Sequence, residues 1–270
     1  MKLLRYAINE QTYCGVLNGE EIMRLGLPDL RALMSPDAAF VETGQLDKLA
    51  DARIMPPLLP GKILAIGRNY AEHARELNNE APSEPLVFAI MPSALIGDGD
   101  IIEWEAEMTA QVDWEGELAV IIGKTARKVS AADALDAVFG YTIANDISAR
   151  DLQSRDKQWT RAKGLDTFCP LGPVIVSADA IPDPQNLRIV TTVDGVEMQN
   201  GSTADMIFDV RFLIAHLSRA FTLNPGDVIL TGTPAGVGKA RKPPQFLGDG
   251  SVVSIEIEGI GKLTNRCRVL

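Results

Sequence analysis

Three acidic residues near the middle of the chain have the types and spacing of a divalent-metal site. Glu115 and Glu117 stand two residues apart, at the start of an apolar run over residues 118–122 that is typical of a strand buried on both faces. Side chains alternate along a strand, so residues two apart share a face. Neighbouring carboxylates repel each other unless a cation or a proton lies between them, and Mg²⁺ and Ca²⁺ prefer such oxygen ligands. The competing interpretation is a pair of solvated acids at an exposed strand end.

Asp146 ends another strand-like segment and would complete a three-carboxylate site. Such a site leaves coordination positions open for water and a chelating substrate. Lys163 could supply a fixed cation near developing oxyanion charge, although a solvated lysine is the ordinary alternative.

One of the two histidines is placed to act as a base. Glu76 follows His73 by three residues, so on a helix the two side chains share one face. A carboxylate beside an imidazole orients the ring and raises its basicity, which suits a general base that activates water. The alternative is an ordinary pair on a surface helix. His216 lies in an apolar helical stretch and is interpreted as a structural histidine.

The glycine-rich segment over residues 231–239 superficially resembles a phosphate-binding loop but lacks its defining features. The gap before Gly238-Lys239 is one residue too long, Ala240 replaces the required Ser or Thr, and Pro243-Pro244 prevents a helix from following. Nucleotide binding is therefore rejected. The glycines still allow backbone amides to approach a ligand closely, so we expect a substrate loop here.

The composition is that of an acidic globular protein. Of the 270 residues 46% are hydrophobic, and 36 acidic against 26 basic residues give a formal net charge of −10. An acidic chain without basic runs argues against nucleic acid and anionic membranes as partners, and no apolar run has transmembrane length. The three cysteines are far apart and odd in number, which indicates free thiols in a reducing compartment. Without a secretory apolar region at the start, the sequence predicts a cytoplasmic protein.

The apolar runs and turn signals predict many strands and few helices. A small unit over residues 1–58 should contain strands at 6–8 and 13–17, a hairpin turn at Asn18-Gly19 and a short helix at 28–34. The proline-rich segment 56–61 marks its boundary with a main domain over 59–270. There, strands are expected at 62–67, 86–90, 118–122, 141–144, 173–176, 187–193, 196–198, 227–230 and 251–258, and helices at 68–77, 131–139 (capped by Ser130) and 210–220. The predicted fold class is α+β, mainly β.

Five motifs occur in an order that resembles the fumarylacetoacetate hydrolase family. They cover residues 60–265 and are Gly67-Arg68-Asn69-Tyr70 with His73 and Glu76; Glu115-Gly116-Glu117-Leu118-Ala119-Val120; Tyr141 with Asn145-Asp146 and Ser148-Ala149-Arg150-Asp151; Ala162-Lys163-Gly164 with Asp166-Thr167-Phe168-Cys169-Pro170; and Pro225-Gly226-Asp227 through Thr231-Gly232-Thr233-Pro234. This resemblance implies a mixed β-roll with a small N-terminal accessory domain, and a homodimer.

The resemblance also implies roles for individual residues. It implies Mg²⁺ or Mn²⁺, with Ca²⁺ as a substitute, on Glu115, Glu117 and Asp146. His73 and Glu76 would be a water-activating pair on a lid segment, and Lys163 would stabilise the enolate or oxyanion. The contacts expected for a small 2-oxo acid substrate are Arg68, Tyr70, Arg150, Gln153 and Thr233. One departure is Ile90, because many members carry Lys at this place in a Phe-x-Lys strand; its absence would remove a cation for a second acidic group on the substrate.

The resemblance to this family implies a metal-dependent hydrolase that cleaves a C–C bond in an acylpyruvate or a fumarylacetoacetate-like 2,4-dioxo acid. A 2-oxo carboxylate can chelate the metal, which draws charge into the carbonyl as a Lewis acid. The alternatives are an oxaloacetate decarboxylase or a hydroxydienedioate isomerase on the same metal site and, outside enzymes, a non-catalytic ligand-binding relative. Hydrolysis needs a placed water, whereas decarboxylation needs only a stabilised enolate.

Overall fold

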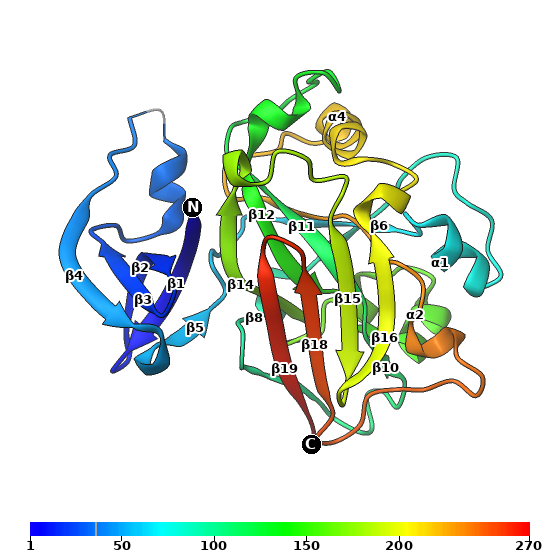
Figure 1. Ribbon diagram of the computed structural model, residues 1–270. Coiled ribbons are helices and arrows are strands. Elements are labelled where there is room, and N and C mark those ends of the chain that lie inside the picture. The colour runs from blue at the N-terminus through cyan, green and yellow to red at the C-terminus, as the bar shows by residue number, and fades with distance from the viewer. Residues whose placement is uncertain (36) are drawn as a thin grey trace.

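Strands dominate the computed structural model, which describes residues 1–35 and 37–270 (Figure 1). Nineteen strands and four α-helices lie within these residues, together with short 3-10 turns. The predicted class, α+β and mainly β, is confirmed. In the described part of the chain, no helix combines the length and apolar character needed to cross a bilayer.

The larger sheet runs through most of the molecule. Its strands are β1 (Lys2–Ile8), β2 (Gln11–Asn18), β3 (Glu21–Leu25), β4 (Glu42–Lys48), β5 (Arg53–Met55), β6 (Ile63–Gly67), β7 (Leu86–Ile90), β8 (Leu95–Ile96), β11 (Gly116–Ile122), β12 (Val138–Asn145), β14 (Cys169–Ser177) and β17 (Val228–Leu230). They follow the order β4-β3-β2-β1-β14-β12-β11-β17-β6-β7, with β5 beside β1 and β8 beside β14. Because β1 pairs with β14, the N-terminal strands join the main sheet; the predicted division after residue 58 stays a prediction.

A second sheet faces the first across the core (Figure 1). Its strands are β9 (Ile101–Trp104), β15 (Arg188–Val193), β16 (Val196–Ser202), β18 (Val252–Ile257) and β19 (Gly261–Val269), in the order β16-β15-β18-β19-β9. The two sheets approach closely, since a Cβ atom on Gly116 of β11 would lie 2.3 Å from Thr191 Oγ1 of β15. A short pair, β10 (Val112–Asp113) and β13 (Ser148–Ala149), lies beside them. Pairs such as β6 with β17 are parallel and most others antiparallel, so the sheets are mixed as predicted.

The central strand β11 is buried along its whole length. Its apolar residues pack on both faces, with Leu118 and Val120 in one core cluster and Ala119 and Ile121 in another. Each fully buried Leu, Ile or Val side chain contributes about 1.5–3 kcal/mol to folding. The strand is therefore a rigid base for the acidic residues at its N-terminal end.

The helices are α1 (Ala71–Glu76), α2 (Arg150–Asp156), α3 (Thr160–Lys163) and α4 (Val210–Ala220). The prediction of a helix at 210–220 is confirmed, and α1 occupies part of the predicted 68–77 segment. The helix predicted over 131–139 is wrong. Only a 3-10 turn over Ala134–Ala137 forms, and Ser130 Oγ accepts a bond from Asp133 N in a local turn. Pairing of Val138 with Ile122 of β11 extends the following strand and overrides the helical propensity of the alanines.

A buried polar network stabilises the N-terminal strands. Tyr6 Oη donates to Asp47 Oδ2 at 2.5 Å, and Arg24 binds both oxygens of the same carboxylate at 2.9 Å. The Arg24 guanidinium also lies 3.6 Å from the centre of the Tyr13 ring. The charge of Asp47 therefore organises donors from β1 and β3.

We expect Asp47→Asn to lower the free energy of unfolding by about 2 kcal/mol at pH 7, because two charge-assisted interactions are weakened. Burial raises the pKa of the Asp47 carboxyl, but the bonds from Arg24 and Tyr6 outweigh it and hold that pKa below its ordinary value. The stabilisation is complete above the unfolded pKa and is lost as the pH falls through the folded one. Denaturant titrations should thus show a constant difference from pH 7 to about 4, shrinking below. Asp51→Asn, at an exposed position, is the control; equal stability of both variants would contradict the assignment.

Candidate active site

The three predicted metal ligands meet where β11 begins and β12 ends. Gly116 pairs with Asn145, which brings Glu115 and Glu117 beside Asp146. One oxygen atom from each of these three buried carboxylates lies within 4.8 Å of the others. Asn145 Oδ1 accepts from Glu115 N at 3.1 Å, and Asp146 N donates to Glu115 O at 2.9 Å. The backbone therefore fixes the three side chains as one acidic cluster.

Two buried cations neutralise part of this cluster. Lys163 Nζ lies 2.7 Å from Glu115 Oε2 and 2.6 Å from Asp146 Oδ2. Arg150 pairs with Glu115 Oε1 at 2.7 Å and with Asp113 Oδ2 at 2.8 Å. In the described residues Glu117 has no cationic partner at bonding distance; its Oε2 accepts from Gly232 N at 2.7 Å.

The charges of this buried group favour a divalent cation. Four carboxylates, Asp113, Glu115, Glu117 and Asp146, face the two cations Lys163 and Arg150, so four negative charges less two positive ones leave a formal charge of −2. Asp146 Oδ1 is also buried without a hydrogen-bond partner in the described part of the chain. An oxygen-only donor set with this charge deficit fits an ion such as Mg²⁺. Glu115, Glu117 and Asp146 are thus the residues that could hold a metal.

The pKa shifts within the cluster follow from the same charges. Burial, Asp146 and Glu115 together raise the pKa of Glu117 well above its ordinary value. Burial also raises the pKa of Asp146, to about 6, against the opposing effect of Lys163. For Glu115, burial is outweighed by Lys163 and Arg150, which bring its pKa to about 2. A cluster without metal therefore favours retaining a proton, which a bound cation would displace.

His73 and Glu76 form an oriented pair on α1. His73 Nδ1 lies 2.7 Å from Glu76 Oε1, and Glu76 Oε2 accepts from Gly236 N at 2.9 Å. Because an ionised carboxylate only accepts hydrogen bonds, Nδ1 carries the proton of the neutral ring and Nε2 keeps its lone pair. The pair has the geometry of a general base held by a carboxylate.

Backbone amides of the glycine-rich loop after β17 hold carboxylates of the site in place. The loop's amides donate to protein carboxylates: Gly232 N to Glu117, Gly236 N to Glu76, and Gly238 N to Asp113 at 2.7 Å. Gly232 and Gly236 adopt φ angles of +98° and +112°, which side chains rarely tolerate. The expectation of a substrate loop here stays a prediction. The loop orients the site's carboxylates, and its side chains Thr233 and Lys239 line the cavity.

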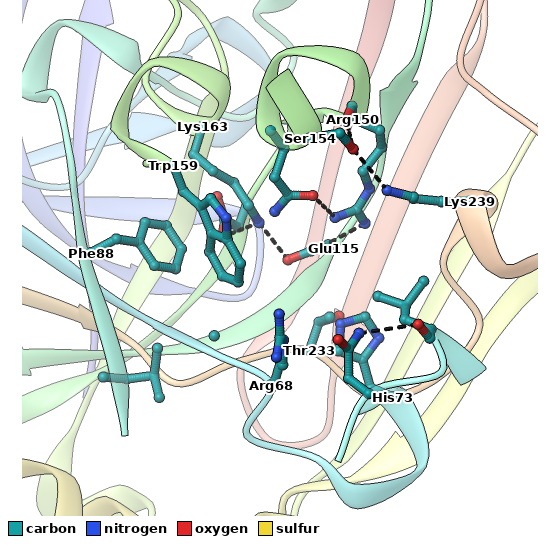
Figure 2. A pocket seen from close by; sticks show the side chains of 16 residues that line it. Arg68, His73, Phe88, Glu115, Arg150, Ser154, Trp159, Lys163, Thr233 and Lys239 are labelled. Carbon is teal, nitrogen blue, oxygen red and sulfur yellow. Dashed lines mark hydrogen bonds and ion pairs between the residues drawn. The ribbon is translucent and has the colours of Figure 1, made fainter. Parts of the chain in front are cut away.

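A cavity of about 320 Å³ opens over the acidic cluster (Figure 2). Most of the predicted site residues lie in its wall: Arg68, His73, Glu115, Asp146, Arg150, Gln153, Lys163 and Thr233. Glu76 and Glu117 are behind this wall, bound to His73 and Gly232 respectively. Tyr70 is buried and is not in this wall; the residue lines a separate hollow with Arg75 and Asp205, while burial and the charge of Glu117 raise the pKa of its hydroxyl well above the ordinary value.

Sequence reasoning missed several residues that shape the site. Asp113 is fully buried and its Oδ2 accepts from both Arg150 Nε and Lys239 N, so it joins α2 to the glycine-rich loop. It lies in the same segment as Glu115 and Glu117, and that proximity was the available signal. Phe88 and Trp159 form an apolar side of the cavity, with their ring centres 5.3 Å apart.

Ile90 lies on β7, two residues after the cavity residue Phe88. Ile90 is buried in the core, pairs with Ile63 of β6 and is absent from the cavity wall. Arg68 and Lys239 both line the cavity, so cations remain available for a second acidic group.

Comparisons with known proteins agree with this geometry. The model of the fumarylacetoacetate (FAA) hydrolase C-terminal family matches residues 62–268. The chain is 49% identical to the oxaloacetate tautomerase YisK of Bacillus subtilis over 222 residues, 81% of this chain and 74% of that protein. It is 45% identical to a mitochondrial oxaloacetate tautomerase of Xenopus laevis over 237 residues, 87% of this chain and 74% of that protein.

Solved structures are similar over the whole chain. A fumarylacetoacetate hydrolase from Exiguobacterium antarcticum is 40% identical with a TM-score of 0.91, covering 100% of both chains. A 2-hydroxyhepta-2,4-diene-1,7-dioate isomerase from Mycobacterium marinum is 39% identical with a TM-score of 0.85, covering 100% of this chain and 98% of that one. The predicted β-roll and the resemblance in the motifs are confirmed. This chain is an enzyme of the fumarylacetoacetate hydrolase family.

Proposed function

We propose that this enzyme interconverts the enol and keto forms of a small 2-oxo dicarboxylic acid, with oxaloacetate as the first candidate. The observation that carries the proposal is the oriented base: His73 lines the cavity that holds the acidic cluster, with Nδ1 bound by Glu76. Relatives that are 49% and 45% identical are named oxaloacetate tautomerases, and a similar structure is named an isomerase. The proposal therefore follows the isomerase alternative rather than the expected C–C hydrolase.

The side chains of the cavity support a proton transfer between carbon and oxygen. In the keto-to-enol direction His73 Nε2 would accept the proton from the carbon next to the keto group and deliver it to the enolate oxygen; the enol-to-keto direction is the reverse, and Glu76 keeps the ring aligned in both. Lys163 Nζ donates two of its three N–H groups to Glu115 and Asp146. The third N–H group would donate a hydrogen bond to the enolate oxygen. Mg²⁺ or Mn²⁺ bound by the acidic cluster would supply Lewis-acid polarisation of the keto oxygen. One shuttled proton suffices, whereas hydrolysis needs a placed water as well.

The test is to mix the Mg²⁺-loaded protein with the enol form of oxaloacetate and follow the ultraviolet absorbance of the enol. We expect the enol to decay at a rate proportional to the protein concentration, above the rate with Mg²⁺ alone, without matching formation of pyruvate. Acetylpyruvate serves as the parallel substrate. Acetate and pyruvate from acetylpyruvate, with no effect on the oxaloacetate enol, would instead establish the hydrolase; pyruvate formed as fast as oxaloacetate disappears would indicate a decarboxylase.

A further inference from the structure

Lys239 is a half-buried cation in the cavity wall that the proposed proton transfer does not use. Its Nζ donates to the neutral Ser154 Oγ at 3.3 Å. Within residues 1–35 and 37–270, no carboxylate lies within ion-pair distance of this Nζ, whereas Arg150 and Lys163 are each paired with two. Lys239 thus carries a charge that is directed at the cavity and not balanced by the protein.

The position of Lys239 is built into the fold. Its backbone N–H donates to Asp113 Oδ2 at 3.0 Å, and the same oxygen accepts from Arg150 Nε at 2.8 Å. Ser154 Oγ donates to the carbonyl of Arg150 at 2.9 Å, so the partner of the lysine is also fixed. Figure 2 shows Lys239 reaching from the glycine-rich loop toward α2, where Arg150 and Ser154 lie. Such anchoring is not expected of an ordinary solvated lysine.

The surroundings of Lys239 favour an anion beside it. Burial and the nearby charge of Arg150 lower the pKa of the Lys239 ammonium group, while Asp113 opposes this only in part. A ligand carboxylate would compensate both effects. Ser154 lies four residues after Arg150 in α2, a rise of about 6 Å along the axis. Lys239 Nζ is bound at this Ser154, whereas Arg150 is bound to the carboxylates Asp113 and Glu115.

We propose that Lys239 binds the substrate carboxylate farther from the acidic cluster, and thereby selects dicarboxylic over monocarboxylic 2-oxo acids. The inference rests on the proposed function in one respect: the 2-oxo acid end of the substrate lies at Glu115 and Asp146. The distal carboxylate then replaces Ser154 as the principal partner of Nζ. Lys239 is accordingly a specificity residue, and the proton-transfer step itself does not involve it.

Binding of two unreactive probes measures the preference for dicarboxylic acids separately from the rate of the reaction. Malate and lactate share a 2-hydroxy carboxylate end, and only malate carries the second carboxylate. By calorimetry on the Mg²⁺-loaded protein, we expect malate to bind at least about tenfold more tightly than lactate. Lys239→Met should weaken malate binding about tenfold or more and lactate binding less than about threefold, because the methionine keeps the backbone bond to Asp113. Lys239→Arg should restore most of the preference.

Lys242→Met is the matched control, since Lys242 is exposed, three residues along the same segment and absent from the cavity wall. It should keep the preference of the wild type. Equal binding of malate and lactate by the wild type, or an undiminished preference in Lys239→Met, would overturn the role of Lys239. A preference that depends on Lys239 in a protein that does not accelerate enol decay would support this role and overturn only the proposed function.

Discussion

His73→Gln is expected to lower the rate of enol–keto interconversion by about 10²–10⁴-fold, the usual contribution of a positioned general base. The side chain is buried, and its Nδ1 is bound to Glu76, so only Nε2 can exchange a proton with a substrate. Glutamine is polar and of similar length but does not act as a base. Because His73 is not one of the three clustered carboxylates, binding of Mg²⁺ should be unchanged. Stopped-flow absorbance gives the rate, and calorimetry gives the metal affinity.

His216→Gln is the matched control for this change. His216 is half-buried on α4, where its ring stacks on Phe212 at 6.0 Å, and it is absent from the cavity wall. Glu76→Gln should lose less activity than His73→Gln, and adding it to His73→Gln should cause little further loss, because the two residues act as a unit. Full turnover by His73→Gln would remove the base from the mechanism. Loss of metal binding in that variant would indicate that the substitution disturbs the cluster instead.

The fold was predictable from sequence where local and tertiary preferences agree. The apolar runs at 63–67, 86–90 and 118–122 became β6, β7 and β11; β6 and β11 are buried between neighbouring strands, whereas β7 pairs with β6 at the edge of the sheet and is only partly buried. The Asp194-Gly195 turn joins β15 to β16, with Val193 paired to Val196. The helix predicted over residues 131–139 is wrong because its alanines favour a helix, whereas pairing with β11 requires an extended chain from Val138 onward. Strand β4 was not predicted, because it is largely exposed and polar and its sequence lacks the alternation of apolar and polar residues that indicates a strand.

The part of the candidate site that was predictable from the sequence is the part whose chemistry follows from residue types alone. Paired glutamates and a nearby aspartate indicate a cation site without knowledge of the fold, and the structure brings these residues together. Sequence separation hides the remaining contacts: Lys163 lies 48 residues from Glu115, and Gly238 lies 125 residues from Asp113. Lys239 was considered only as part of a failed phosphate-binding motif, and its contact with Ser154 of α2 depends on the tertiary fold.

The glycine-rich loop links the separate parts of the site. Consecutive stretches of it donate to Glu117 in the cluster, to Glu76 behind the base, and to Asp113 beneath Arg150. Each of these bonds uses a backbone N–H group, which carries no net charge, in a region that already has a deficit of positive charge. These amides therefore position acidic groups without neutralising their charge. Neutralisation must come from Lys163, Arg150 and a bound cation.

Glu117→Gln is expected to lower the affinity for Mg²⁺ or Mn²⁺ by about 100-fold or more, since it removes a ligand charge from the cluster. This position gives a cleaner test than Glu115 or Asp146, whose removal would leave Lys163 buried without a full set of partners. Gln keeps the shape of Glu, and its carbonyl oxygen can still accept from Gly232 N. The metal-free variant should be at least as stable as the wild type, because a buried carboxylate without a cationic partner is replaced by a neutral amide.

Thermal unfolding with and without metal distinguishes this mechanism from simple damage to the fold. Metal at 100 times the dissociation constant should stabilise the wild type by about 2.7 kcal/mol, and this gain should nearly vanish in Glu117→Gln. Glu107→Gln makes the same chemical change at an exposed position and should retain the gain. An undiminished, metal-dependent increase in the melting temperature of Glu117→Gln would show that the cation binds elsewhere. A large loss of stability in the metal-free variant would mean that Glu117 is chiefly a structural residue, held by Gly232 rather than reserved for a metal.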